Sequence, residues 1–222
     1  MKKATVVTLL LPIALLGSAA AQNVVASSVY LVTHYSNANT AKAPDATLRL
    51  INDGTQATAC PDGACNGTLW ADIYVLDDSE EMISCCSCVI TADGVLSESV
   101  NQQLVNPAGP PGGGVLGSTF STRGEYSRGV IEVISSNNSD PTNPVPVPGL
   151  RGWMTHIQAS SVSSLGTDNP VEAAPFYVTE AEVADSNLSP LDASDLGAVC
   201  GYALNDNSPW GWCGCSPEDN DF

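Results

Sequence analysis

The sequence predicts an all-β protein, a disulfide-stapled β-sandwich with one C-terminal helix. Short runs of Thr, Val, Ile and Tyr alternate with clusters of Gly, Pro, Asn and Asp, which is typical of strands and turns. Hydrophobic residues make up 43% of the chain, enough for a core, and eight cysteines are present. Eight short strands without regular intervening helices favour a sandwich over βαβ units. The strands are expected at Ser28–Tyr35, Thr47–Asn52, Thr68–Leu76, Ile83–Thr91, Val95–Asn101, Gly129–Ser135, Leu150–Ala159 and Pro175–Ala184.

The C-terminal helix is expected from Pro190 to about Ala203. Ser189 is a suitable N-cap, proline is favoured at the first helical position, and Asp192 places a negative charge in the first turn. The helix is predicted to dock on the sheets through apolar residues on one face. These residues are Leu191, Leu196, Val199 and Cys200. The Pro- and Gly-rich segments 106–114 and 137–149 are expected to be exposed loops within one domain.

The N-terminus has the pattern of a secretory signal peptide. Lys2 and Lys3 precede a short apolar run from Val6 to Leu16, and Ala19–Ala21 supplies a cleavage site. Cleavage after Ala21 would leave residues 22–222 as the mature domain. The apolar run is too short to span a membrane, and no later stretch reaches the required length of about 20 residues. The sequence therefore predicts a secreted, extracellular protein without a membrane span.

The charge balance excludes two classes of partner. Asp and Glu number 24 against 7 Lys and Arg, which gives a net charge of −17. Nucleic acids and anionic membranes are bound through clustered Lys and Arg, so neither is an expected partner. Self-association or another cell-surface protein is expected instead.

Eight cysteines, an even number in an oxidising compartment, predict four disulfides. They are Cys60, Cys65, Cys85, Cys86, Cys88, Cys200, Cys213 and Cys215. Cys60 and Cys65 flank a turn and can pair locally. Cys85 and Cys86 point to opposite faces if they lie in a strand, so they should take different partners, and the tail Cys213–Cys215 is the natural source of two. The alternative is a zinc site built from the same C-C-x-C and C-x-C thiolates.

The segment from Cys85 to Gly94, with the pattern C-C-x-C-x-I-T-x-D-G, resembles a family of uncharacterised secreted Cys-rich proteins from acidobacteria. The resemblance continues through Leu150–Ile157 and returns at Cys200 and the closing C-G-C. It implies a secreted, Cys-rich fold and carries no assigned activity. That family often has a Cys where this chain has Trp70, so its bridge pattern does not transfer whole.

Sequence motifs give no support for catalysis, and no catalytic residues are predicted. His34 and His156 each lie in a candidate strand without an adjacent partner carboxylate, which is typical of packed strand residues. Neither G-x-S-x-G nor H-E-x-x-H occurs. Gly112–Gly117 matches G-x-G-x-x-G, but Pro110 and Pro111 precede it where a dinucleotide fold needs a strand.

Cofactors are not expected, with calcium as the one exception. An acidic run between two strands, made of Asp77, Asp78, Glu80 and Glu81, supplies the oxygen ligands of a weak Ca²⁺ site. The loop Asn205–Asn207 is a second candidate for Ca²⁺. Solvated charge in a turn is the alternative interpretation of both.

The predicted function is that of a non-enzymatic structural or assembly protein at the cell surface, in the matrix or in extracellular filaments. The alternatives are a ligand- or glycan-binding module, with Trp153, Trp210 and Trp212 as a sugar platform, and, less favoured, an extracellular hydrolase. Trp153 is otherwise expected in the core and the other two around the disulfides. Assembly by strand addition is assigned to an uncharged, β-prone N-terminal arm, which can instead form the first strand of its own sandwich. The arm comprises Gln22, Asn23, Val24, Val25, Ala26 and Ser27.

Overall fold

The computed structural model describes residues 28–36, 38, 43–58, 67–105, 128–159, 176–187, 189–205 and 211–215. The signal peptide, the arm 22–27, the Cys60 and Cys65 pair, the loops 106–114 and 206–207, and Trp210 lie outside these residues. The strands are β1 (Tyr30–Tyr35), β2 (Thr47–Asn52), β3 (Leu69–Asp77), β4 (Met82–Ile90), β5 (Val95–Ser99), β6 (Gly129–Ser136), β7 (Leu150–Ala159), β8 (Phe176–Glu182), β9 (Ala184–Asp185) and β10 (Gly211–Trp212). Three helical elements accompany them: a 3₁₀ turn, η1 (Thr55–Thr58), a π-helical turn, η2 (Val100–Leu104), and the helix α1 (Pro190–Asn205).

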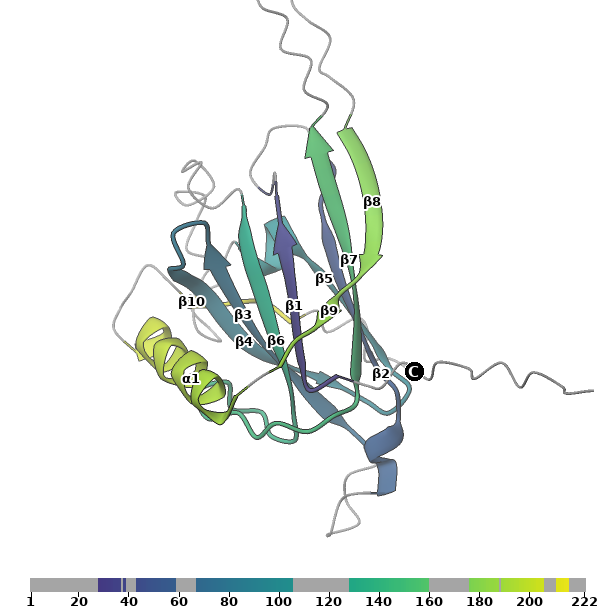
Figure 1. Ribbon diagram of the computed structural model, residues 1–222, viewed down its shortest axis with the longest axis vertical. Helices are drawn as coiled ribbons and strands as arrows, with labels where there is room; N and C mark the ends of the chain where they lie inside the picture. Colours follow the sequence, from purple (N-terminus) through teal and green to yellow (C-terminus); the bar gives the residue numbers. More distant parts are fainter. Residues whose placement is uncertain are drawn as a thin grey trace, which may run out of the picture.

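These elements form two sheets and confirm the predicted all-β sandwich. One sheet has the order β10-β4-β3-β6-β1-β9 and the other the order β5-β2-β7-β8 (Figure 1). All the pairings are antiparallel except that of β10 with β4. The main core lies between the sheets. Leu48, Leu50, Ile73, Val133 and Met154 are among its fully buried members.

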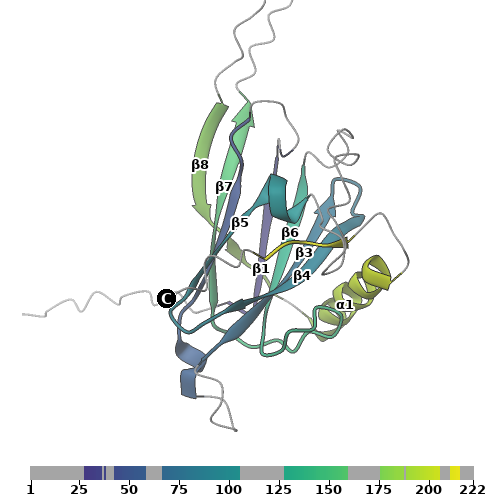
Figure 2. The ribbon, with the colours of Figure 1, turned by 180° about the vertical axis from the view of Figure 1, so that it is seen from behind.

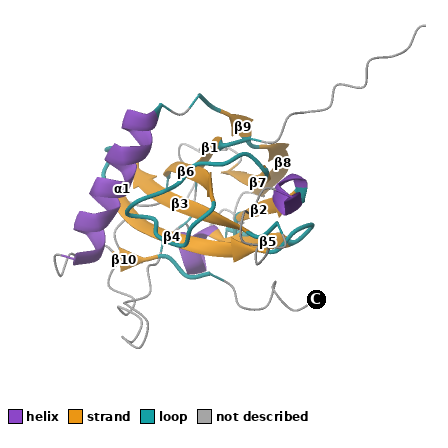
Figure 3. Ribbon diagram, turned by 90° about the horizontal axis from the view of Figure 1, so that it is seen from below, coloured by secondary structure: helices purple, strands orange, loops and turns teal. Residues whose placement is uncertain are grey.

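Helix α1 covers the outer face of the six-stranded sheet, so the described part of the chain has three layers (Figure 3). It begins as predicted: Ser189 Oγ accepts a hydrogen bond from the Asp192 amide, and Asp192 Oδ2 accepts one from the Ser189 amide. The predicted docking face is partly wrong, because Leu191 and Val199 are exposed. Of the other predicted residues, Cys200 is buried and Leu196 is partly buried against the sheet. Ala193 and Ala203 are also buried, and their small side chains let the helix approach the sheet closely.

Two predicted strands end two residues earlier in the structure, whereas the others end within one residue of their predicted last residue. Val95–Asn101 continues only to Ser99, after which the chain turns into the π-helical turn η2 (Figure 2). The Ser99 hydroxyl caps this turn by accepting a hydrogen bond from the Gln102 amide. Pro175–Ala184 is divided at Val183, which is buried and donates its amide to the Gly152 carbonyl. The chain thereby leaves β8 in one sheet and enters β9 in the other.

The predicted exposed loop at 137–149 is only partly exposed. Pro141 and Gly149 are buried, and the Pro141 carbonyl accepts a hydrogen bond of 2.8 Å from the Tyr74 hydroxyl. Pro146 forms a bridge to Ser136 at the end of β6. The loop therefore packs over part of the outer face of the six-stranded sheet.

Candidate functional site

Strand β8 is the most exposed edge of the sandwich. It pairs along its whole length with β7, from Phe176 opposite Ala159 to Glu182 opposite Trp153, and it ends its sheet. Every residue after Phe176 is exposed, including the apolar Tyr177 at 60% and Val178 at 53%. An edge strand of this kind offers unpaired backbone groups to another strand unless Lys, Pro or a cover blocks it. β8 contains neither Lys nor Pro.

The other edges found among the described residues are shorter. β9 and β10 have two residues each, and β5 has five with alternating burial. β10 lies along β4 and is tied to it by disulfides, so it closes that edge. β8 is thus the edge best suited to pairing with a further strand.

The outward face of the four-stranded sheet carries Trp153, which corrects the prediction that this residue is in the core. Gly152 and Met154, its neighbours in β7, are buried, so Trp153 projects away from the core and is half-buried. Arg49 lies opposite Trp153 on β2, and its guanidinium is 2.5 Å from a Glu180 carboxylate oxygen. Trp212 lies in β10 on the other sheet, so the described tryptophans do not form one platform.

Two of the cavities among the described residues lie beside α1, and neither includes Trp153. A cavity of about 520 Å³ lies between loop 137–149 and the start of α1, with Thr142, Pro144 and Pro190 among its lining residues. A second, of about 290 Å³, lies beside α1 and combines the apolar Leu76, Met82 and Leu196 with carboxylates such as Glu132 and Asp195. Neither is lined by tryptophan, as a sugar-binding cleft commonly is.

Three of the predicted disulfides are present. Cys85 bonds to Cys200 on α1, Cys86 to Cys213, and Cys88 to Cys215. Adjacent Cys85 and Cys86 take different partners, as predicted from strand alternation. The tail supplies a partner for Cys86 but not for Cys85, because Cys85 faces the helix layer whereas Cys86 faces the core between the sheets.

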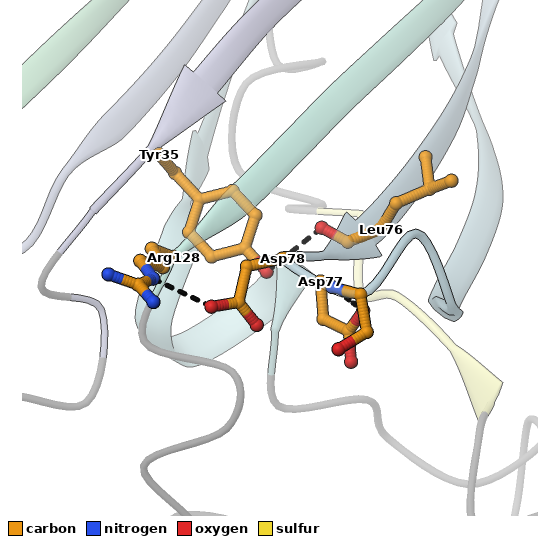
Figure 4. Close-up of polar contacts among 6 residues, drawn as sticks. Tyr35, Leu76, Asp77, Asp78 and Arg128 are labelled. Carbon is orange, nitrogen blue, oxygen red and sulfur yellow. Dashed lines mark hydrogen bonds and ion pairs between the residues drawn. The ribbon is translucent and has the colours of Figure 1, made fainter.

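The acidic run forms the β3–β4 turn (Figure 4). Asp77 Oδ1 accepts hydrogen bonds from the Ser79 and Glu81 amides at 2.8 and 3.0 Å, and Asp78 lies 2.7 Å from the Arg128 guanidinium. Glu80 adopts φ 65°, which closes the turn. Asp77 is buried, so its carboxylate completes the turn much as a helix cap does. Calcium binding at this run stays a prediction.

Substituting Asp77 with alanine should lower the free energy of unfolding by about 1–3 kcal/mol, because the Ser79 and Glu81 amides lose their charged acceptor. Without a calcium site in the turn, the loss is the same in calcium as in magnesium at equal ionic strength. Chemical denaturation of both proteins in each ion measures this. A larger loss in calcium would instead assign a calcium site to the turn. Exposed Glu81→Gln serves as the matched control for charge.

His34 and His156 form a pair that the sequence analysis treated as two separate strand residues. Their rings stack with centroids 4.2 Å apart and an interplanar angle of 17°, which joins β1 of one sheet to β7 of the other. Thr33 Oγ1 lies 3.4 Å from His156 Nε2. Burial, and then the neighbouring His34, lower the pKa of His156. No linear spacing relates the two histidines, so only the tertiary fold could reveal the pair.

A second unpredicted feature is the buried carboxyl of Asp72 on β3. Its side chain is 0% exposed, lies opposite Ser87 of β4, and forms no hydrogen bond of standard geometry with any described residue. Burial raises the pKa of Asp72 to about 7, an effect partly opposed by the nearby Ser87 and Ser136 hydroxyls. A charged residue inside the apolar run Leu69–Leu76 is the sequence signal that could have identified it.

The described cysteines also form the one group with the composition of a metal site. Among the described residues, the only three or more His, Cys, Asp or Glu side chains close enough to share an ion are Cys86, Cys88 and Cys215. None of the described helices is sufficiently long and apolar to cross a membrane. No family model, curated protein or solved structure matches this chain, and the resemblance to the acidobacterial family stays a prediction.

Proposed function

We propose that this chain is a secreted, non-enzymatic structural protein that assembles at a cell surface, in a matrix or into filaments by strand addition at β8. The observation that carries the proposal is the exposure of β8 along seven residues of sheet edge. Multiple disulfides and the lack of a membrane-spanning helix in the described residues are consistent with an extracellular location.

The strand that adds to β8 is the N-terminal arm Gln22–Ser27 of another copy. Six extended residues span about 20 Å, which is comparable to the length of the seven-residue β8. The side chains of the arm are uncharged and therefore add no repulsion beside Glu180 and Glu182. Tyr177 and Val178 offer it apolar contacts at the other end of β8.

The positions of the two partners favour a head-to-tail contact. Ser28, which follows the arm, bridges to Leu150 at the beginning of β7. β8 begins at the opposite end of the same hairpin, where Phe176 pairs with Ala159. The donor arm therefore leaves one end of each subunit, and the acceptor edge β8 reaches the other end. Such a head-to-tail interface is heterologous, and it propagates as a fibre unless the rotation between subunits closes a ring.

Changing Val178 to lysine should shorten or abolish the polymers, because the charge blocks the free edge without disturbing a buried residue. Deleting Gln22–Ser27 while keeping residues 1–21 should have the same effect. Val145, which is 41% exposed in loop 137–149, supplies the matched control Val145→Lys. Sedimentation and electron microscopy of the secreted proteins compare polymer lengths.

Two results would contradict the proposal. Polymers of unchanged length in the Val178→Lys and deletion variants would show that neither partner forms the interface. A parent protein that stays monomeric at high concentration would exclude assembly. The outward face around Trp153 would then become the better candidate, as a ligand-binding surface.

A further inference from the structure

Four sulfurs converge where the C-terminal tail meets β4. Cys86 and Cys88 are two residues apart in a strand and therefore point to the same face, and so do their partners Cys213 and Cys215. The Cys86 and Cys88 sulfurs belong to different disulfides but lie only 3.8 Å apart. The sulfurs of Cys86, Cys88 and Cys215 all lie within 4.8 Å of one another, and the Cys213 sulfur is bonded to that of Cys86.

The separation of the Cys86 and Cys88 sulfurs is that found in a tetrathiolate metal site. A tetrahedral zinc ion with Zn–S bonds of about 2.3 Å holds its sulfurs about 3.8 Å apart. The Cys86–Cys88 separation already has this value, and the Cys86–Cys215 separation needs to contract by no more than about 1 Å to reach it. The sulfurs of the two bonded pairs, Cys86–Cys213 and Cys88–Cys215, must move apart to this distance once their disulfides are reduced. Three of the four cysteines are buried, so the ion would be largely shielded from water.

Backbone pairing holds the tail in place independently of its disulfides. Trp212 pairs in parallel with Cys85, and the Cys213 amide donates to the Cys85 carbonyl at 3.2 Å. The Gly214 amide donates to the Gln103 carbonyl at 3.0 Å. We expect these bonds to keep the two C-x-C segments side by side when the sulfur–sulfur bonds are broken.

We propose that Cys86, Cys88, Cys213 and Cys215, once reduced, bind one Zn²⁺ or a similar soft divalent ion, so that the same four sulfurs hold either two disulfides or a metal. The reductant is an external dithiol or phosphine. Each disulfide takes up two electrons and two protons, and the reductant is oxidised correspondingly. Cys215 is exposed and gives the reductant access to the first bond. The metal then displaces four thiol protons and gains four thiolate ligands.

Cobalt(II) is the probe for the site, since tetrahedral cobalt thiolates absorb strongly in the visible and near ultraviolet. The experiment uses the full chain with Cys60→Ser and Cys65→Ser, because these changes remove two thiols that lie outside the described residues. This protein is reduced without oxygen and titrated with Co²⁺. We expect one cobalt per chain, charge-transfer intensity of four thiolates, displacement by Zn²⁺, and a raised melting temperature.

Two paired variants locate the ligands. Cys85→Ser with Cys200→Ser removes the bridge to α1 and should leave the cobalt spectrum unchanged. Cys86→Ser with Cys213→Ser removes half of the site and should weaken binding roughly a hundredfold or more, because even residues outside the ligand set change metal affinity by 10–100-fold.

The proposal is overturned if the Cys86→Ser, Cys213→Ser variant binds cobalt as tightly as its parent. It is also overturned if the charge-transfer intensity of the parent corresponds to only two thiolate ligands. It is equally overturned if the reduced chain keeps its β-sheet circular dichroism but binds no cobalt. A reduced chain that loses its sheet and does not regain it with metal also overturns it, because the backbone contacts would then be insufficient to hold the site.

Discussion

Replacing Asp72 with asparagine should make the protein more stable at about pH 8 and remove much of its loss of stability between about pH 4 and pH 8. The carboxyl is fully buried on β3, and burial raises its pKa from 3.8 to about 7. The folded state therefore binds a proton that the unfolded state releases at about pH 4. Its contribution to stability is complete below that pH and is lost as the pH rises through about 7.

The expected size of this change in stability follows from the pKa shift of Asp72. One unit corresponds to about 1.4 kcal/mol, so the raised pKa of Asp72 represents on the order of 4 kcal/mol between acid and weakly alkaline solution. Nearby Asp140 adds to the shift, and the same Asp72 charge helps to raise the pKa of Tyr74. Asparagine keeps the shape and cannot ionise.

Guanidinium denaturation across this pH range compares the parent with Asp72→Asn. The exposed Asp195 on α1 supplies the control Asp195→Asn, whose profile should follow that of the parent. A parent protein whose stability rises between about pH 5 and pH 8, or an Asp72→Asn variant with the parent's slope, would contradict the role assigned to Asp72.

When the three described disulfides are removed one after another, the free energy of unfolding should fall least for the first bridge removed and most for the last. Cys85–Cys200, Cys86–Cys213 and Cys88–Cys215 connect nearly the same two regions, with sequence separations of 115, 127 and 127. While Cys86–Cys213 remains, Cys85–Cys200 closes a loop of only about 15 residues, which is worth about 3 kcal/mol. A last remaining bridge closes more than 100 residues and is worth about 5 kcal/mol.

The experiment removes Cys85 and Cys200 by alanine substitution in the parent and in a chain that already lacks the other two bridges. Denaturation gives the free energies of unfolding, and amide exchange shows whether α1 opens first in the single-bridge variant. Equal losses in both backgrounds would mean that each bridge acts through local packing, not through the entropy of the unfolded chain.

The sequence was sufficient for the elements whose signals are local. Alternating apolar residues in Thr47–Asn52 and the cap at Ser189 determine structure within a few residues, and both are found as predicted. The opposite directions of Cys85 and Cys86 follow from the strand alone. The segment around Val183 shows the limit, because only the position of a second sheet decides where the strand divides.

The site was less predictable, because its features depend on long-range contacts. Stacking of His34 on His156 requires β1 and β7 to lie side by side across two sheets. Burial of Asp72 requires loop 137–149 to cover a face that the strand pattern leaves open. Trp153 was expected in the core because it lies in a strand. Its neighbours Gly152 and Met154 are the buried residues of β7, so the alternation of the strand turns Trp153 outward.

The division at Val183 has a mechanical consequence. β8 and β9 are successive parts of one segment. A force applied to β8 therefore passes through the hydrogen bond from the Val183 amide to the Gly152 carbonyl, and on to the pairing of β9 with β1. The load is then shared between both sheets, and neither can slide alone. Pulling β8 along its axis must shear its hydrogen bonds to β7 together, which resists force far better than opening them one at a time. A subunit held by this strand would transmit tension through its whole body.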